Sequence, residues 1–165
     1  MTKFYVIRHA EAEGNLYRRI HGWYDSLITP NGYRQIAALE GRFAQEPIDA
    51  VYSSDLFRTK TTAGAIYRPH GLTLHTRSSL REFGVGVWED RTWGDLERHE
   101  PVLLNHFNHA DSEFQVEGGE TVEQVQARMK GTLLELAQVH PGRTVALFSH
   151  GAAIRCLQGA VRGLG

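Results

Sequence analysis

The sequence predicts one α/β domain, a three-layer α/β/α sandwich whose central sheet is mostly parallel. Apolar runs at residues 3–7 and 144–148 are typical of strands that are buried on both faces. Helical patterns separate such runs along the chain, and this alternation favours a parallel sheet covered by helices. The 165 residues suit a single domain with a substantial core.

Local signals place the remaining elements. Thr29 is suited to cap a helix that begins at Pro30. Residues 50–53 and 72–75 are expected to be the second and third strands, and Ser54 or Asp55 is expected to cap the helix between them. The later segments are expected to be helical: two short helices broken near Pro101 (residues 93–107), a long amphipathic helix (121–139) and a last helix from Ala152.

The composition excludes several classes of protein. The net charge of −1 gives the chain no general electrostatic attraction to nucleic acid or to an anionic membrane. The 41% hydrophobic and 22% charged residues are ordinary for a soluble globular protein. No run approaches the ~20 apolar residues of a membrane span, and no signal peptide is visible, so a cytoplasmic protein is expected. Cys156 is the single cysteine, which rules out an intrachain disulfide and suggests a buried apolar role. No pattern sets an oligomeric state.

Two histidines stand where two of the expected strands end. His9 follows the first strand after Arg8, and His150 follows the last. Ligands of open α/β sheets bind just beyond the carboxyl ends of the strands, so we expect both rings at one edge. Arg58 in the first turn of a helix and Glu82 in the loop after the third strand fall at the same edge.

This set of residues predicts a phosphate pocket. Two arginines and a histidine can donate several hydrogen bonds to a tetrahedral dianion, and the backbone N–H groups at Gly151, where the last helix begins, would add to them. The second histidine is then free to act as a nucleophile, and a carboxyl group can protonate the leaving oxygen. Each residue alone has a plainer explanation, as a hydrogen-bonding histidine, a surface ion-pair partner or a solvated carboxylate.

The motifs resemble those of the histidine phosphatase superfamily, also called the phosphoglycerate mutase-like family. Arg8-His9-Ala10-Glu11 with Asn15 is similar to the Arg-His-Gly-Glu signature, with alanine where glycine is commoner. Further agreeing stretches span the chain: residues 25–32, 51–59, 80–89, 118–121 and 149–151. Residues 80–89 also resemble broad-specificity phosphatases and α-ribazole phosphatase-like enzymes.

The resemblance implies a phosphoglycerate mutase-like fold and a phosphomonoesterase of the histidine acid phosphatase-like kind. Such an enzyme hydrolyses small phosphorylated metabolites through a phosphohistidine, without metal or cofactor. His9 would be the nucleophile, and Glu82 the proton donor and later the base. The phosphoryl group would be bound by His150, Arg8, Arg58 and Asn15, with Gly22 at a loop position that contacts substrate.

Several alternatives stay open at this point. A cofactor-dependent phosphoglycerate mutase of the same fold is the second interpretation, and a catalytically silent phospho-ligand-binding module is the third. His106 and His109 could suggest a metal pair, although a solvated helix face is favoured because no further ligand is near in the sequence. Leaving-group recognition is expected around Arg18, His21, Trp23 and Trp88. Family members usually continue beyond residue 165, so residues 1–165 are expected to lack the C-terminal portion of one domain.

Overall fold

Four parallel strands form the central sheet of the protein, in the order β1-β4-β2-β3. The structure is a computed structural model that describes residues 1–162. Its strands are β1 (Lys3–Arg8), β2 (Ala50–Ser53), β3 (Leu74–Thr76) and β4 (Thr144–Ser149). β4 lies between β1 and β2 and is almost wholly buried, as expected for an apolar central strand.

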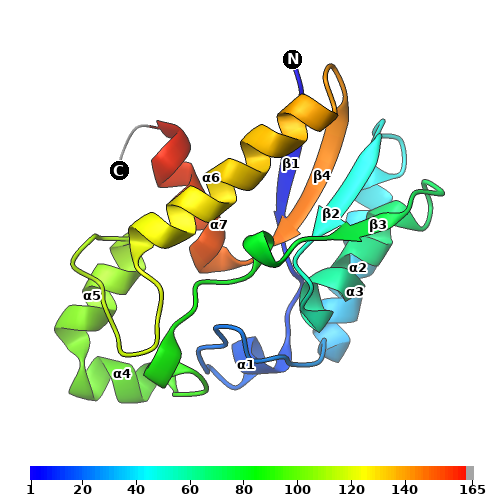
Figure 1. Cartoon of the computed structure of the whole chain (residues 1–165). Coiled ribbons are helices and arrows are strands. Elements are labelled where there is room, and N and C mark those ends of the chain that lie inside the picture. The colour runs from blue at the N-terminus through cyan, green and yellow to red at the C-terminus, as the bar shows by residue number, and fades with distance from the viewer. Residues whose placement is uncertain (163–165) are drawn as a thin grey trace.

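The strand register aligns the carboxyl ends of β1, β2 and β4 at one edge of the sheet. Arg8 pairs with Ser149 across β1 and β4, and Ser53 pairs with Phe148 across β2 and β4. The pairing continues one residue further, because the His9 N–H donates to the Ser149 carbonyl at 3.1 Å. The arrowheads of β1 and β4 therefore end together, at the bottom of the sheet in Figure 1. Whatever follows these strands is held in fixed positions at this edge.

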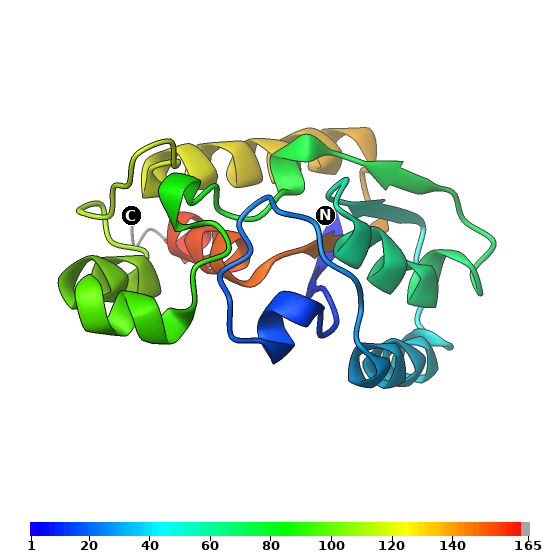
Figure 2. The same ribbon diagram turned by 90° about the horizontal axis from the view of Figure 1, so that it is seen from below.

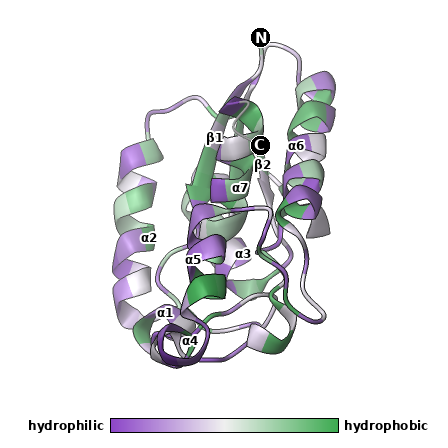
Figure 3. Ribbon diagram, turned by 90° about the vertical axis from the view of Figure 1, so that its left-hand side faces the viewer, coloured by the Kyte–Doolittle hydropathy of each residue, from purple (hydrophilic) through white to green (hydrophobic). Residues whose placement is uncertain are grey.

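Helices cover both faces of the sheet, which confirms the predicted three layers. On one face lie α2 (Pro30–Phe43) and α3 (Phe57–Tyr67), and on the other lie α6 (Val122–Val139) and α7 (Gly151–Arg162). Figure 3 shows α2 and α6 on opposite sides of the strands. Separate apolar clusters fill the two interfaces. Within residues 1–162, no helix has the length and apolar character needed to cross a membrane.

Three further helices lie beyond the carboxyl ends of the strands. They are α1 (Glu13–Leu16), α4 (Trp93–His99) and α5 (Pro101–His109), which Figure 2 shows from below. The break between α4 and α5 falls at Pro101, as predicted, because proline has no N–H to donate and disfavours helical geometry in the residue before it. Glu100 accordingly has φ −135° and ψ 46°.

The predicted helix cap is confirmed at α2 and wrong at α3, and α6 has a side-chain cap that was not predicted. The Thr29 hydroxyl accepts from the Gly32 N–H at 3.0 Å, and Thr121 forms a reciprocal capping box with Gln124. Neither Ser54 nor Asp55 caps α3, which starts from Leu56 without a side-chain cap. Asp55 instead holds Arg81 through two bonds of 2.7 Å.

The third strand begins two residues later than predicted. Gly71 has φ +64°, and the Leu72 N–H donates back to the Tyr67 carbonyl at 2.9 Å. This left-handed glycine closes the end of α3 and uses the N–H that Leu72 would give to a neighbouring strand. β3 therefore starts only at Leu74.

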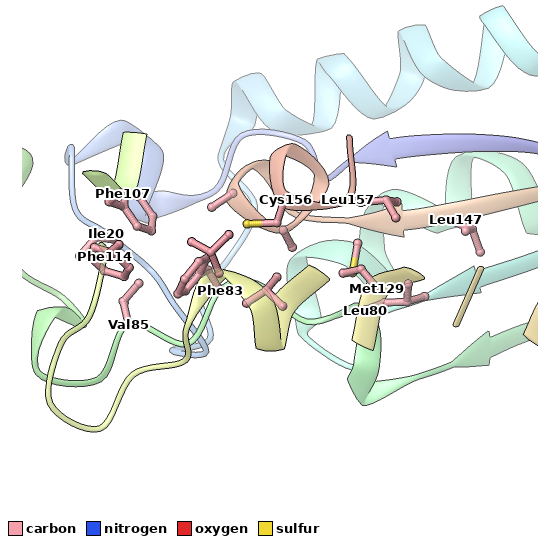
Figure 4. Close-up of a cluster of buried hydrophobic side chains, with 14 of the residues drawn as sticks. Ile20, Leu80, Phe83, Val85, Phe107, Phe114, Met129, Leu147, Cys156 and Leu157 are labelled. Carbon is pink, nitrogen blue, oxygen red and sulfur yellow. The ribbon is translucent and has the colours of Figure 1, made fainter. Parts of the chain in front are cut away.

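One apolar cluster joins the sheet to the region of α4 and α5. Figure 4 shows it running from Leu147 and Leu80 near the strands to Phe107 and Phe114. Cys156 lies within the cluster, and burial raises the pKa of its thiol to about 12, which confirms its predicted apolar role. Close-packed interiors have low compressibility, so this packing fixes the position of α5 relative to the strand ends.

Candidate active site

His9 lies at the end of β1 with its ring almost fully buried. Its Nδ1 is 2.7 Å from the Ala10 carbonyl oxygen, so the ring proton is assigned to Nδ1 and Nε2 keeps its lone pair. Burial, and then the charge of Arg58, lowers the pKa of His9 to about 3. The ring is therefore neutral at pH 7, which is the form that a nucleophile requires.

His150 packs beside His9, with ring centroids 5.2 Å apart. Its Nε2 is 2.8 Å from the Ser54 hydroxyl, which also bonds to Thr59. Its Nδ1 is buried and has no hydrogen-bond partner among residues 1–162. Burial, followed by the charge of Arg58, lowers the pKa of His150 well below its usual value. Sequence reasoning did not find the supporting role of Ser54, which follows β2 at the same sheet edge.

Arg58 is completely buried at the start of α3. Its two terminal nitrogens donate to the carbonyls of Gly22 and Tyr24 at 2.9 and 2.8 Å. Its Nε is buried and lacks a partner in the described part of the chain. Buried polar atoms are nearly always paired, so Arg58 Nε and His150 Nδ1 both need a partner that residues 1–162 do not supply. An ordered water molecule or a bound oxyanion can fill this role.

A cavity of about 440 Å³ opens in front of His9. Its lining includes six of the eight site residues that the sequence predicted: Arg8, His9, Asn15, Gly22, Glu82 and Gly151. Arg58 and His150 are not part of the lining and lie buried behind it. The structure thus brings the predicted residues together in two layers, one facing the cavity and one beneath it.

Two glycines shape this cavity. A Cβ on Gly22, where φ is +56°, would lie 2.7 Å from the Glu89 carboxylate. A Cβ on Gly151 would lie 3.3 Å from Arg8 Nε, so the missing side chain lets the Arg8 guanidinium pack against the start of α7. Asn15 accepts from the Ala12 N–H at 3.0 Å through its carbonyl oxygen. Asn15 itself lines the cavity.

Glu82 is bonded to the start of α7. Its carboxylate accepts N–H bonds from Ala153 at 2.8 Å and from Ala152 at 3.3 Å, and one from its neighbour Phe83 at 2.8 Å. The sequence predicted that N–H groups at this helix start would bind phosphate. Two of them instead hold the carboxylate, which is favourable at the positive end of a helix. Glu82 is therefore a fixed, half-buried group and not the solvated carboxylate of the plainer explanation.

Arg128 on α6 positions the loop that carries Glu82, and sequence reasoning missed it. Its guanidinium donates to the carbonyls of Ser79, Arg81 and Glu82 at 2.8–2.9 Å. It also pairs with Glu120, whose carboxylate accepts from the Gly84 N–H. The only sequence signal was that residues 118–121 matched a family stretch. This network fixes the backbone on both sides of Glu82.

The aromatic residues expected to recognise the leaving group are placed differently. Trp88 is fully buried against Phe107 and Phe114, so its predicted role in recognition is wrong. The Trp23 indole N–H donates to the Glu82 carbonyl at 2.7 Å, and Trp23 does not line the cavity. The two other residues of this expectation, Arg18 and His21, do line it.

His21 is a buried neighbour of the candidate nucleophile. Its ring centroid lies 6.0 Å from that of His9, and its Nε2 is 2.8 Å from the Ser26 hydroxyl. A Cβ on Gly14 would lie 2.2 Å from this ring, so glycine is required there. Burial lowers the pKa of His21 to about 3, which leaves it neutral at pH 7.

The residues considered for a metal pair have other partners. His106 Nδ1 is 3.0 Å from an Asp111 carboxylate oxygen, and His109 Nδ1 is 2.8 Å from the Asn105 carbonyl. Within residues 1–162, no group of three or more histidine, cysteine, aspartate or glutamate side chains is arranged to hold a metal ion.

Comparison with known proteins decides the family. The sequence matches the model of the histidine phosphatase superfamily (branch 1) over residues 4–165. The chain belongs to the histidine phosphatase superfamily. The predicted phosphoglycerate mutase-like fold and family are thereby confirmed.

The relatives of this histidine phosphatase superfamily member carry different activities in their names. Probable phosphoglycerate mutase GpmB of Salmonella choleraesuis is 32% identical over 164 residues, which are 99% of this chain and 76% of the relative. The solved structure of Bacillus stearothermophilus YhfR has a TM-score of 0.92 at 28% identity, covering 99% of this chain and 81% of that one. A mutant phosphoserine phosphatase from Entamoeba histolytica, in complex with phosphoserine, has a TM-score of 0.86 at 27% identity with the same coverage.

Proposed function

We propose that this chain is a phosphomonoesterase that hydrolyses small phosphate esters through a phosphohistidine at His9. The observation that carries the proposal is one cavity lined by a neutral histidine, a half-buried carboxyl group and an arginine. Arg8 in the lining, with Arg58 behind it, supplies the positive charge that stabilises a transferring phosphoryl group. Phosphatases among the structural neighbours support the same reaction class.

The proposed reaction has two steps. His9 Nε2 forms a bond to phosphorus as the ester P–O bond breaks, and the departing oxygen takes a proton from the Glu82 carboxyl group. A water molecule then attacks phosphorus and the P–N bond breaks. The Glu82 carboxylate takes the proton of that water, which restores both side chains.

Turnover of p-nitrophenyl phosphate by the purified protein tests the proposal, and a panel of phosphorylated metabolites follows it. Release of inorganic phosphate far above a heat-killed control is expected. Binding without turnover of any ester would instead identify a silent phospho-ligand-binding module.

A phosphoglycerate mutase is the second candidate, because the curated relatives carry that name. A mutase must shield its phosphoenzyme from water until a second substrate takes the phosphoryl group, and this usually needs extra chain over the site. The Glu82 loop is followed by two short helices, α4 and α5, and Arg91 and Arg98 are the two arginines between Glu82 and the end of α5. We therefore expect transfer to water to be faster. Incubation with 3-phosphoglycerate and a trace of 2,3-bisphosphoglycerate tests this, since conversion to 2-phosphoglycerate faster than phosphate release from every ester would establish the mutase.

Catalysis is expected to persist after exhaustive treatment with EDTA. The permanent charges of Arg8 and Arg58 occupy the role that a divalent ion has in metal-dependent phosphatases, and an added ion would compete for the same phosphate oxygens. The measurement is phosphate release before and after chelation and dialysis. Activity that disappears and returns only with added zinc or magnesium would contradict the proposed site.

A further inference from the structure

The cavity extends well past the residues that would hold a phosphoryl group. Its far part is lined by residues of α4, α5 and α7: Trp93, Glu97, Leu104, Phe107, Asn108 and Arg155. A volume of about 440 Å³ is in the range of small-molecule sites and leaves room for more than a phosphate. The far part is therefore where the leaving group of an ester bound at His9 would lie.

Arg155 is the distinctive charged group of this far part. Its Cζ lies 5.6 Å from the centroid of the Phe107 ring, and its Nε is buried without a hydrogen-bond partner among residues 1–162. No carboxylate in the described part of the chain forms an ion pair with it, although Glu97 lines the same cavity. Buried charges are normally paired, so a half-buried arginine in this state is suited to an anionic ligand.

The position of Arg155 on α7 matches a short ligand. It follows Gly151 by four residues, so the two positions share a helix face and lie one turn apart, about 6 Å along the axis. Gly151 lines the phosphoryl end of the cavity beside Arg8. A phosphate ester of a short hydroxy acid carries its carboxylate only a few covalent bonds from its phosphorus, so the two anionic groups of such a ligand belong at neighbouring positions of one cavity such as these.

The three other arginines in the lining are less suited to this role, and one of them, Arg8, lies at the phosphoryl end. Arg18 and Arg19 are exposed, and Arg19 is paired with Asp90. Water and salt screen exposed charges, whereas a planar guanidinium held on an aromatic ring and partly removed from water can bind a carboxylate through two parallel bonds.

We propose that Arg155 is a specificity-determining residue that binds the carboxylate of a phosphorylated hydroxy acid while the phosphoryl group lies at His9. This inference rests on the proposed phosphatase function and names its substrate class. Hydrogen bonds to charged groups contribute about 1.5–3 kcal/mol, which corresponds to a preference of roughly 10- to 100-fold in kcat/KM.

The test compares 3-phosphoglycerate with glycerol 3-phosphate, which have the same carbon skeleton and differ in the carboxylate. Wild-type enzyme is expected to prefer 3-phosphoglycerate by at least about tenfold in kcat/KM. Arg155→Met, which keeps an apolar stem against Phe107, is expected to lose that preference while its rate on glycerol 3-phosphate stays within about twofold. Arg155→Lys should recover part of it, and Arg98→Met, which removes an exposed arginine of α4 outside the cavity, should keep all of it.

The outcomes separate this inference from the proposed function. Wild-type enzyme that hydrolyses p-nitrophenyl phosphate but does not distinguish the two esters would overturn the role of Arg155 alone. The same holds if Arg155→Met slows both esters equally while it still hydrolyses p-nitrophenyl phosphate. Absence of any turnover by the wild-type enzyme contradicts the phosphatase itself.

Discussion

The His9→Ala enzyme is expected to lose at least about 10⁴-fold in kcat, because residues of a covalent catalytic site act as a unit and the variant lacks the imidazole that forms the bond to phosphorus. His9 Nε2 is the unprotonated nitrogen of a ring that stays neutral at pH 7, since burial lowers its pKa to about 3. Rapid quenching of the wild-type reaction, followed by mass spectrometry, should find acid-labile phosphate on His9. The variant should show none.

Two controls show that such a loss comes from chemistry and not from unfolding. His75→Ala removes an exposed imidazole from β3 and should retain wild-type turnover. The melting temperature of His9→Ala should show a folded protein, because the bond from the Ala10 N–H to Thr62 at 2.9 Å does not involve the imidazole. Near wild-type turnover by folded His9→Ala, or phosphate on another residue, would disprove the nucleophile.

The edge of the sheet where the site lies could be predicted from the sequence. Apolar runs that end abruptly at Arg8 and Ser149 mark buried parallel strands, and such strands end at one edge. The structure places the rings of His9 and His150 5.2 Å apart there. The local apolar runs were sufficient because His9 and His150 directly follow β1 and β4 in the sequence.

Residues that act through loops could not be predicted in the same way. Glu82 meets α7 because Arg128, 46 residues later in the chain, holds its carbonyl. No local pattern reports a contact of that sequence separation. Trp88 shows the opposite error, because an aromatic residue in a loop suggested ligand recognition but lies in the core with its indole N–H bonded to Glu100 at 3.0 Å.

The surroundings of the last helix could be predicted only in part. The four-residue spacing of Gly151 and Arg155 predicts that they share a face of α7. The residues that contact this face of α7 depend on how α4 and α5 pack beyond the strand ends. Phe107 on α5 supplies the aromatic surface under Arg155, and only the tertiary structure brings the two together.

Glu82→Gln is expected to slow esters of poor leaving groups by about 10²–10⁴-fold, the usual contribution of a general acid. An alkoxide such as that of glycerol must gain a proton as it departs, whereas p-nitrophenolate departs without one. The variant should therefore retain most of its activity on p-nitrophenyl phosphate. The measurement is kcat/KM for a series of esters plotted against the pKa of the leaving alcohol, and the plot should be much steeper for the variant than for the wild type.

The same carboxylate also caps α7. The plot must therefore distinguish activity lost through a weakened helix start from activity lost through the missing proton donor. Glutamine keeps a carbonyl oxygen that can accept the Ala153 N–H, so the helix start should persist, and any lost capping would lower all rates alike. Glu97→Gln is the matched control, because it removes another carboxylate from the cavity lining and should leave the slope unchanged. If Glu82→Gln lowers the rates of alkyl and aryl esters by the same factor, Glu82 positions α7 and another group must protonate the leaving oxygen.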